Sequence, residues 1–342
     1  MKFYKLLSIL CISFCSLTLI SCNNNSNNES SYEEELDYTR GLLFELTLQG
    51  NSYAVSAGAA LDKDVIIPER YNGLPVSNIK MSGFHNYTTL ESIYIPSSIK
   101  VIEEYAFRSC SNLKEINIPD SVNKIGSGAF YGCNSLEELS ISKNVTYIGE
   151  SITEGCVNLK SIVIDEENEN YNSNNNCNAI IETNSNSLIA GCYTSIINSD
   201  VVAIKQGAFA GCNKLSFIYI PSSVTSIEYC AFAGCDALVN LIIPSSVVNI
   251  ESWAFYNCAN LKEVTIENGL TKLDEAIFKD CKKLESIVIP TSITYIDNSS
   301  FSNCISLKNI YYTGSKESWE TLINSVNSPE IINAKVTYNY TN

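Results

Sequence analysis

Residues 220–244 read IPSSVTSIEYCAFAGCDALVNLIIP, and this stretch ends on the Ile-Pro pair with which it begins. Its pattern, Ile-Pro-Ser-Ser-Val-x-x-Ile-x-x-x-Ala-Phe-x-x-Cys-x-x-Leu, recurs along most of the 342-residue chain. The phenylalanines of the repeat stand 23 residues apart within two blocks, which are Phe84, Phe107 and Phe130, and then Phe209, Phe232, Phe255, Phe278 and Phe301. Thr153 fills the Phe position of one degenerate copy. A fixed period of this size is typical of a solenoid.

Each copy of the repeat predicts one coil of that solenoid. Leu113, Ile116 and Ile118 alternate as in a strand with one buried face, and Pro119 ends the strand because it has no N–H to donate. The apolar residues that follow have the spacing of a short helical turn against the core: Ala129, Phe130, Cys133 and Leu136. A single coil buries too little apolar surface to be stable, so coils stack with parallel strands about 4.8 Å apart. The sequence therefore predicts an α/β repeat solenoid, in which each 23-residue coil is a parallel strand plus a short helical turn.

The repeat closely resembles that of the BspA-like leucine-rich repeat family of bacterial surface proteins, in which a 23-residue unit carries IPxxVxxIxxxAFxxCxxLxxI. The resemblance is strong over residues 84–312 and weaker at the flanks. It implies a leucine-rich-repeat fold, attachment to the cell surface and a binding function. It does not identify the ligand.

Eight cysteines occupy one position of successive coils, which predicts a buried column of free thiols rather than disulfides or a metal site. They are Cys110, Cys133, Cys156, Cys212, Cys235, Cys258, Cys281 and Cys304. Parallel neighbours in register lie about 4.8 Å apart, beyond the usual Cβ separation of a disulfide. Cys177 and Cys192 flank the hairpin predicted within residues 165–200 and could pair, although the resemblance favours packed thiols. Cys230 lies outside the column and is the best candidate for a reactive thiol.

Composition excludes several classes of function. The formal net charge of −15 repels phosphate backbones, so we do not expect nucleic acid as a partner. The same charge argues against attachment to an anionic membrane through a basic patch of the protein. His85 is the one histidine, so no Ser-His-Asp or Cys-His site can form except around it. No Gly-rich phosphate loop follows a strand. We therefore expect a protein that is not an enzyme and that uses no cofactor or metal.

The N-terminus predicts an exported protein. Residues 1–21 combine Lys2 and Lys5 with a short apolar run, as in a cleaved export signal. The sequence Leu-Ile-Ser-Cys at residues 19–22 resembles the lipobox of bacterial lipoproteins, which implies a lipid on Cys22 and a membrane attachment through that lipid alone. An ordinary secretory signal is the alternative. The Asn-, Ser- and Glu-rich residues 22–37 predict a flexible tether at the bacterial cell envelope.

The remaining boundaries follow from breaks in the repeat. Residues 38–80 predict an N-terminal hairpin cap, residues 81–314 the solenoid, and residues 315–342 a C-terminal cap of a helix, N-capped by Ser315, and a strand. The insertion at 165–200 predicts a loop and a small hairpin that project from the solenoid. Its acidic residues suit Ca²⁺ in type, but their spacing matches no known calcium loop, so a solvated loop is favoured.

The outward positions of the predicted strands form the candidate binding site. Side chains between the inward residues point away from the core, and solenoids use such strand faces to bind. Large apolar side chains at these positions are typical of interface centres. They are Tyr94, Phe217, Tyr219, Ile242 and Tyr311. We therefore predict a monomeric surface protein that adheres to an extracellular protein or glycan; the alternative is a scaffolding protein that binds another component of the bacterial envelope.

Overall fold

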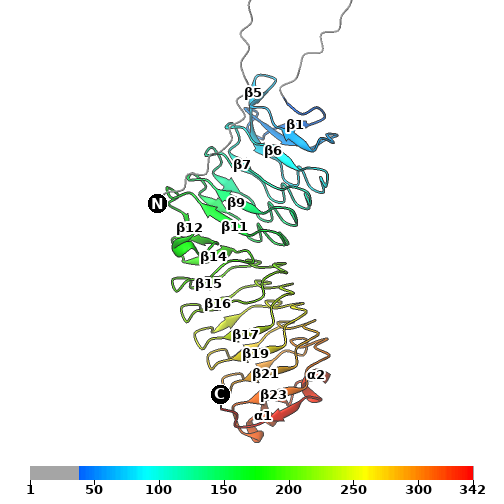
Figure 1. Cartoon of the computed structure of the whole chain (residues 1–342), viewed down its shortest axis with the longest axis vertical. Coiled ribbons are helices and arrows are strands. Elements are labelled where there is room, and N and C mark those ends of the chain that lie inside the picture. The colour runs from blue at the N-terminus through cyan, green and yellow to red at the C-terminus, as the bar shows by residue number, and fades with distance from the viewer. Residues whose placement is uncertain (1–37, 342) are drawn as a thin grey trace, which may run out of the picture. The chain divides into compact units, whose positions relative to one another are not determined.

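The computed structural model describes residues 38–341, and these residues form a solenoid of about 12 turns with a spacing of about 23 residues. The coils stack one upon the next from the N-terminal strands to the C-terminal helices (Figure 1). The solenoid and its repeat length are as the sequence predicts. The predicted export signal, the lipidated Cys22 and the tether lie outside the described residues.

Two columns of strands run along the stack. The long-strand column contains β6 (Ser92–Tyr94), β9 (Glu138–Ile141), β11 (Ser161–Ile164), β17 (Asn240–Ile243), β19 (Glu263–Ile266), β21 (Ser286–Ile289) and β23 (Asn309–Tyr312). The short-strand column contains β7 (Val101–Ile102), β8 (Lys124–Ile125), β10 (Tyr147–Ile148), β15 (Ala203–Ile204), β16 (Ser226–Ile227), β18 (Asn249–Ile250), β20 (Lys272–Leu273) and β22 (Tyr295–Ile296). Strands within each ladder pair in parallel, at a register of 23 residues.

The long-strand column is not one continuous sheet, which differs from the prediction. It consists of a β9–β11 pair and a separate run of β17, β19, β21 and β23, while β6 pairs with β3 (Asp64–Ile66). Residues 113–118 and 216–220 stand at strand positions but are not assigned as strands. Their inward side chains are nevertheless buried, so the alternation predicted by the sequence holds where the hydrogen-bonded ladder does not.

The predicted helical turn at residues 129–136 is not confirmed, because this segment is a series of tight turns and not a helix. Cys133 N–H donates to the carbonyl of Phe130 over 3.1 Å, three residues back rather than four. Gly128 and Gly132 adopt left-handed conformations, with φ of +60° and +69°, which no α-helix can contain. The backbone instead bonds between coils: Phe107 N–H donates to the carbonyl of Ala129 over 2.8 Å. Apolar residues three positions apart are compatible with a helical turn and with a series of tight turns, so periodicity does not distinguish the two.

The core is built from stacked columns of identical residues. The eight repeat phenylalanines are fully buried, and successive rings within each block stack with centroids 5.0 to 5.8 Å apart. The eight cysteines of the predicted column are also buried and free, as expected. Most of these thiols donate to the carbonyl of a phenylalanine in the preceding coil, for example Cys110 to Phe84 over 3.0 Å. The cysteine position of the repeat therefore favours a small apolar side chain that is also a weak hydrogen-bond donor.

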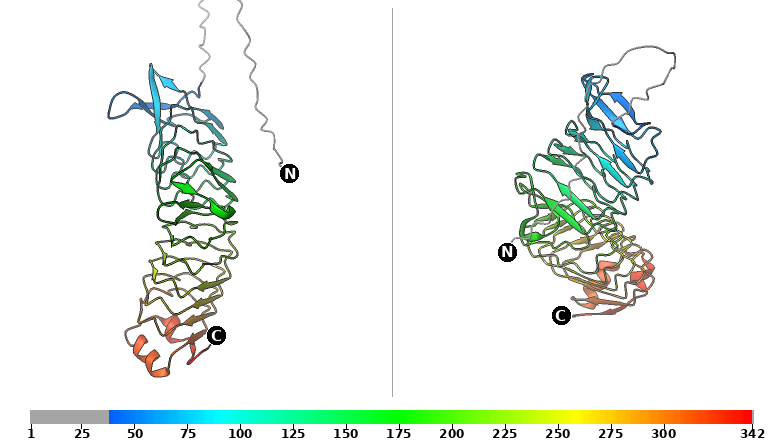
Figure 2. Two further views of the ribbon diagram at one scale, coloured as in Figure 1. Left: turned by 90° about the vertical axis from the view of Figure 1, so that its left-hand side faces the viewer. Right: turned by 45° about the horizontal axis from the view of Figure 1, so that its top comes forward.

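The insertion joins the stack instead of projecting from it, which corrects the prediction for residues 165–200. Its strands β13 (Ile180–Glu182) and β14 (Ser187–Ala190) form the predicted hairpin, but β14 also pairs in parallel with β15 of the next coil. Leu188 is fully buried in the core. A third strand, β12 (Tyr171–Asn172), pairs with β13. Figure 2 shows this green segment within the stack of coils. The sequence therefore predicts the hairpin, but not its pairing with the next coil.

A glycine makes room for this replacement. Gly191 N–H donates to the carbonyl of Ala208 over 2.8 Å, the same bond that Phe107 makes to Ala129 in a regular coil. Gly191 thus holds the phenylalanine position of the inserted coil. A Cβ atom there would stand 2.1 Å from Cε1 of Phe209, so the ring of Phe209 occupies the space that a side chain at Gly191 would need.

Both ends of the solenoid contain the predicted elements. Strands β1 (Leu43–Leu46) and β2 (Tyr53–Ser56) form an antiparallel hairpin, followed by β4 (Arg70–Tyr71) and β5 (Leu74–Ile79). Ser315 N-caps α1 (Lys316–Ile323) by accepting from Ser318 N–H. Then come α2 (Pro329–Ile332) and β24 (Lys335–Thr337), which pairs with β23. With the short 3₁₀ segment η1 (Asn174–Asn176), these are the helices of residues 38–341, and none is long and apolar enough to cross a membrane.

Candidate binding surfaces

Four of the five predicted strand-face residues are exposed. Tyr94 on β6 has 59% of its surface accessible, Phe217 has 70%, Tyr219 has 64% and Ile242 on β17 has 59%. Phe217 and Tyr219 flank Ile218, which is buried in the core, so the alternation of the segment holds both aromatic rings outward. Single exposed apolar side chains are common, so the grouping of these residues on neighbouring coils matters more than the exposure of any one of them.

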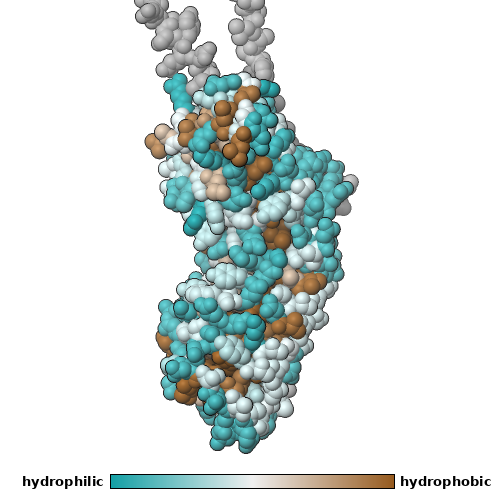
Figure 3. Space-filling view, turned by 180° about the vertical axis from the view of Figure 1, so that it is seen from behind, coloured by the Kyte–Doolittle hydropathy of each residue, from teal (hydrophilic) through white to brown (hydrophobic). Residues whose placement is uncertain are grey.

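Tyr219 and Ile242 occupy the same outward position of successive coils, with Phe217 two residues before Tyr219. We call Phe217, Tyr219 and Ile242 the exposed apolar cluster. Tyr94 stands on β6, in the part of the stack before the insertion, and does not belong to this cluster. Figure 3 shows one side of the molecule, on which hydrophobic side chains gather in patches with polar surface between them.

Tyr311 differs from the prediction, because it is only partly exposed. Its ring packs against that of Tyr340, with centroids 4.8 Å apart. The C-terminal residues therefore cover part of the strand face at β23. The sequence could not reveal this contact, since Tyr340 follows the repeat and its packing depends on how the last segment returns.

A polar hollow of about 700 Å³ lies beside β11, and sequence reasoning missed it. One wall is residues 161–166, and the other includes residues 171–174 of the insertion. Asn178 and Thr194 also line it. The insertion displaces the strand that would follow β11 in a regular stack, so the edge of β11 remains open here. The break in the 23-residue period at residue 165 was the sequence signal for this gap.

Asn178 closes part of the open edge. Its side-chain Nδ2 donates to the carbonyl of Lys160 over 2.8 Å, and its Oδ1 accepts from Ile162 N–H over 2.6 Å. These are the two bonds that a neighbouring strand would make at this point of β11. Asn178 has a φ of +56°, a left-handed conformation that asparagine tolerates better than most residues.

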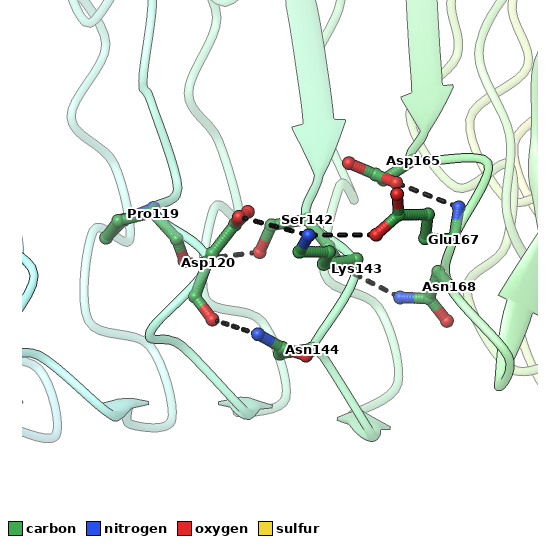
Figure 4. Close-up of polar contacts among 8 residues, drawn as sticks. All are labelled: Pro119, Asp120, Ser142, Lys143, Asn144, Asp165, Glu167 and Asn168. Carbon is green, nitrogen blue, oxygen red and sulfur yellow. Dashed lines mark hydrogen bonds and ion pairs between the residues drawn. The ribbon is translucent and has the colours of Figure 1, made fainter.

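The loop after β11 is held by polar contacts to the preceding coil. Lys143 Nζ lies 2.8 Å from a carboxylate oxygen of Glu167 and 4.0 Å from Asp120 (Figure 4). Asn168 Nδ2 donates to the carbonyl of Ser142 over 2.8 Å, and Asp165 Oδ1 accepts from Glu167 N–H over 2.9 Å. The lysine and the turn therefore occupy groups that a calcium site would need. Within residues 38–341, no group of three or more His, Cys, Asp or Glu side chains is placed to hold a metal.

A second hollow, of about 570 Å³, lies between β18 and β20. Tyr229 and Trp253 line it together with the ion pair of Lys272 and Asp274, whose charged atoms are 2.6 Å apart. Neighbouring Cys230 is half-buried, and burial raises the pKa of its thiol above the ordinary value. A raised pKa lowers the thiolate fraction at neutral pH, which argues against the predicted reactivity of Cys230. His85 is exposed.

The stacked 23-residue coils and their exposed strand faces define a leucine-rich repeat protein. The model of the BspA type leucine rich repeat region matches residues 75–198 and 202–326, more than half of the chain, in six copies. The chain therefore belongs to the BspA-type leucine-rich repeat family. Proteins of this class are generally binding scaffolds that act in protein interaction, and no enzyme family is indicated.

Solved structures agree on the fold. A leucine-rich repeat protein from Eubacterium ventriosum has a TM-score of 0.53 at 21% identity, with 81% of this chain and 84% of that chain covered. The pneumococcal vaccine antigen PcpA has a TM-score of 0.52 at 19% identity, with 88% and 98% covered. At these identities the likeness shows the fold alone. A search of curated proteins gave no match.

Proposed function

We propose that this protein is a lipid-anchored adhesin of the bacterial cell envelope, which binds an extracellular protein through the exposed apolar cluster. The observation that carries the proposal is the exposure of Phe217, Tyr219 and Ile242 on neighbouring coils. When a partner covers these side chains, their apolar surface is removed from water. This burial contributes a favourable free energy of about 25 cal/mol per Å² to binding. Aromatic residues also dominate the energetic centres of protein interfaces.

The surroundings of the cluster support a protein partner. Asn240 on β17 and Glu263 on β19 are exposed on the same strand face, so the apolar centre has polar neighbours. An apolar centre with a polar surround is the usual composition of a protein interface. The net charge of −15 favours a partner with a basic surface, and association should weaken as salt increases.

An array of extracellular-matrix proteins and glycans, probed with the full-length chain, tests the proposal. The test variant replaces Phe217, Tyr219 and Ile242 with Ala. The control variant replaces Tyr147, Tyr295 and Ile305 with Ala; these residues are comparably exposed, but Tyr147 and Tyr295 belong to the short-strand column and Ile305 to a turn. Loss of a protein ligand in the test variant alone, with unchanged melting curves, supports the proposal. Equal binding by both variants contradicts it, and binding of glycans alone would assign a different partner class.

The anchor needs a separate test. Cys22 lies outside the described residues, and its proposed role rests on the lipobox-like residues 19–22. Cells that express the full-length chain and its Cys22→Ala variant can be labelled with an alkyne analogue of palmitate. Label on the parent chain and none on the variant supports lipidation. Label that persists in Cys22→Ala excludes Cys22 as the lipidated residue.

A further inference from the structure

We propose that the open edge of β11 binds an extended, basic peptide segment of a partner protein, which adds to the edge as a strand. This site is separate from the exposed apolar cluster and does not depend on it. Strand addition needs an unpaired edge, space beside it, and side-chain chemistry that suits the incoming chain. The hollow beside β11 provides all three.

The first requirement is the unpaired edge. Ser161 N–H bonds back to Glu137, and Asp165 N–H bonds back to Ile141, so the odd-numbered residues of β11 face β9. The backbone groups of Ile162 and Ile164 alternate to the other side. Asn178 satisfies Ile162 N–H, as described above. Within residues 38–341, the carbonyl of Ile162 and the N–H and carbonyl of Ile164 have no hydrogen-bond partner, and both residues line the hollow.

The second requirement is space. A hollow of about 700 Å³ falls within the range of pockets that hold small ligands, so it can take a few residues of an extended chain. Residues 171–174 and Asn176 of the insertion form the opposite wall of the hollow. An incoming peptide would therefore lie between β11 and that wall, in the position of the missing strand. An unpaired strand edge is a template for main-chain hydrogen bonds, so a peptide added as a strand can bond to the free groups of Ile162 and Ile164.

The third requirement is chemistry that selects the peptide. Asp165 and Glu166 line the hollow, and none of its lining residues is Lys or Arg. Asn172, Asn174 and Asn176 line it as well, and their amides both donate and accept hydrogen bonds. Acidic groups without a cation among the lining residues favour Lys or Arg on the peptide. The nearby Lys143 is already paired with Glu167 and Asp120, so it does not neutralise Glu166.

Ile164→Pro is the decisive variant. Proline removes the N–H that faces the hollow, but it leaves the bonds of Val163 and Asp165 to β9 intact, and edge strands tolerate proline at such a position. Ile164→Val is the matched control, because it keeps the N–H and a similar shape. The probe is the blocked peptide acetyl-Val-Lys-Val-Lys-Val-amide, and binding to the full-length chain is measured by titration calorimetry. We expect Ile164→Pro to weaken binding by about tenfold and Ile164→Val to leave it nearly unchanged.

Three further probes separate strand addition from other modes. Methylation of alternate backbone nitrogens should abolish binding, because it removes the peptide's donors. Exchange of Lys for Glu should also abolish binding, and the neutral sugar cellopentaose should not bind. The proposal would be overturned if the methylated peptide bound equally well or if Ile164→Pro had no effect. It would also be overturned if cellopentaose alone bound, or if no probe bound.

A charge variant keeps the test valid if Ile164→Pro does not fold. Glu166→Lys reverses one charge of the hollow at an exposed residue. Glu285→Lys makes the same change at an exposed residue directly before β21, in a separate sheet. We expect Glu166→Lys to weaken binding of the lysine peptide several-fold at low salt, with Glu285→Lys close to the parent chain. Equal effects of the two variants would show that net charge alone attracts the peptide, and would contradict the proposal.

Discussion

The thiol of Cys133 donates a hydrogen bond to the carbonyl oxygen of Phe107 over 3.2 Å, from one coil to the coil before it. The same carbonyl oxygen also accepts from the cysteine of its own coil, because Cys110 N–H donates to it over 3.1 Å. The column of cysteines and the column of phenylalanines are therefore joined by hydrogen bonds as well as by packing. A carbonyl oxygen has two lone pairs, and both find donors in an otherwise apolar core.

Removal of one thiol from the column should destabilise the fold. Cys258→Ala deletes the bond of the Cys258 thiol to the carbonyl of Phe232 and leaves a small cavity. We expect the free energy of unfolding to fall by about 1–2 kcal/mol. Urea unfolding measures the change. Cys230→Ala is the control, since Cys230 stands outside the column, and its effect should remain below about 0.5 kcal/mol. Equal losses in both variants would show that the thiol bonds contribute nothing specific.

The buried thiols should also make the protein sensitive to alkali. Burial raises the pKa of the Cys110 and Cys156 thiols from an ordinary value of 9.0 to about 12. Above pH 9 the unfolded chain releases these protons while the folded chain keeps them, so the unfolded state is favoured increasingly. Stability should be unaffected by these groups below pH 9 and should fall between about pH 9 and pH 12. Urea unfolding at several pH values, with Cys110→Ala and Cys156→Ala as comparisons, should show a shallower fall in the variants.

Gly191 should not tolerate a side chain. A Cβ atom at residue 191 would stand 2.1 Å from the ring of Phe209, which is fully buried. We expect Gly191→Ala to lower the free energy of unfolding by about 1–3 kcal/mol through overpacking. Phe209→Leu, which removes part of the ring volume, should reduce the cost of Gly191→Ala when the two are combined. A thermal-unfolding double-mutant cycle with no coupling between the two sites would contradict this account.

Asn178 should be required at the edge of β11. Asn178→Ala would leave the carbonyl of Lys160 and the N–H of Ile162 without the partners that Asn178 supplies to them. The expected cost is about 1–3 kcal/mol, together with faster hydrogen exchange at the Ile162 amide. Asn175→Ala is a matched control, because Asn175 also has a left-handed φ, of +57°, but is exposed. Similar exchange at Ile162 in both variants would mean that the Asn178 amide does not close this edge.

Replacement of Ala276 by glycine should not lower the stability of the fold. It is buried and has a φ of +54°, a conformation that costs residues with a Cβ atom roughly 1 kcal/mol. Ala276→Gly should therefore raise the free energy of unfolding slightly or leave it unchanged. Ala254→Gly is the matched control at a buried alanine without a left-handed φ, and it should lower the free energy of unfolding by about 1 kcal/mol. Urea unfolding distinguishes these directions, and an equal loss in both variants would exclude strain at Ala276.

The sequence alone determined which side chains form the core. The 23-residue spacing of Phe232 and Phe255, the cysteine column and the outward placement of Phe217 all followed from periodicity. This succeeds because alternation and repeat length depend on local geometry, which every coil shares. The sequence also predicted the hairpin of β1 and β2 and the helix N-capped by Ser315, since both depend on local turn and capping preferences.

Only the tertiary structure decided how the backbone groups are paired. Left-handed residues such as Gly128 direct the turn segment into bonds between coils rather than into a helix. The insertion was predicted to project because its sequence does not show that β14 is buried and pairs with β15. The open edge of β11 and the cover of Tyr311 by Tyr340 depend on contacts between distant segments. Periodicity reports which face of a segment is buried, but pairing depends on which donors and acceptors the neighbouring segment presents.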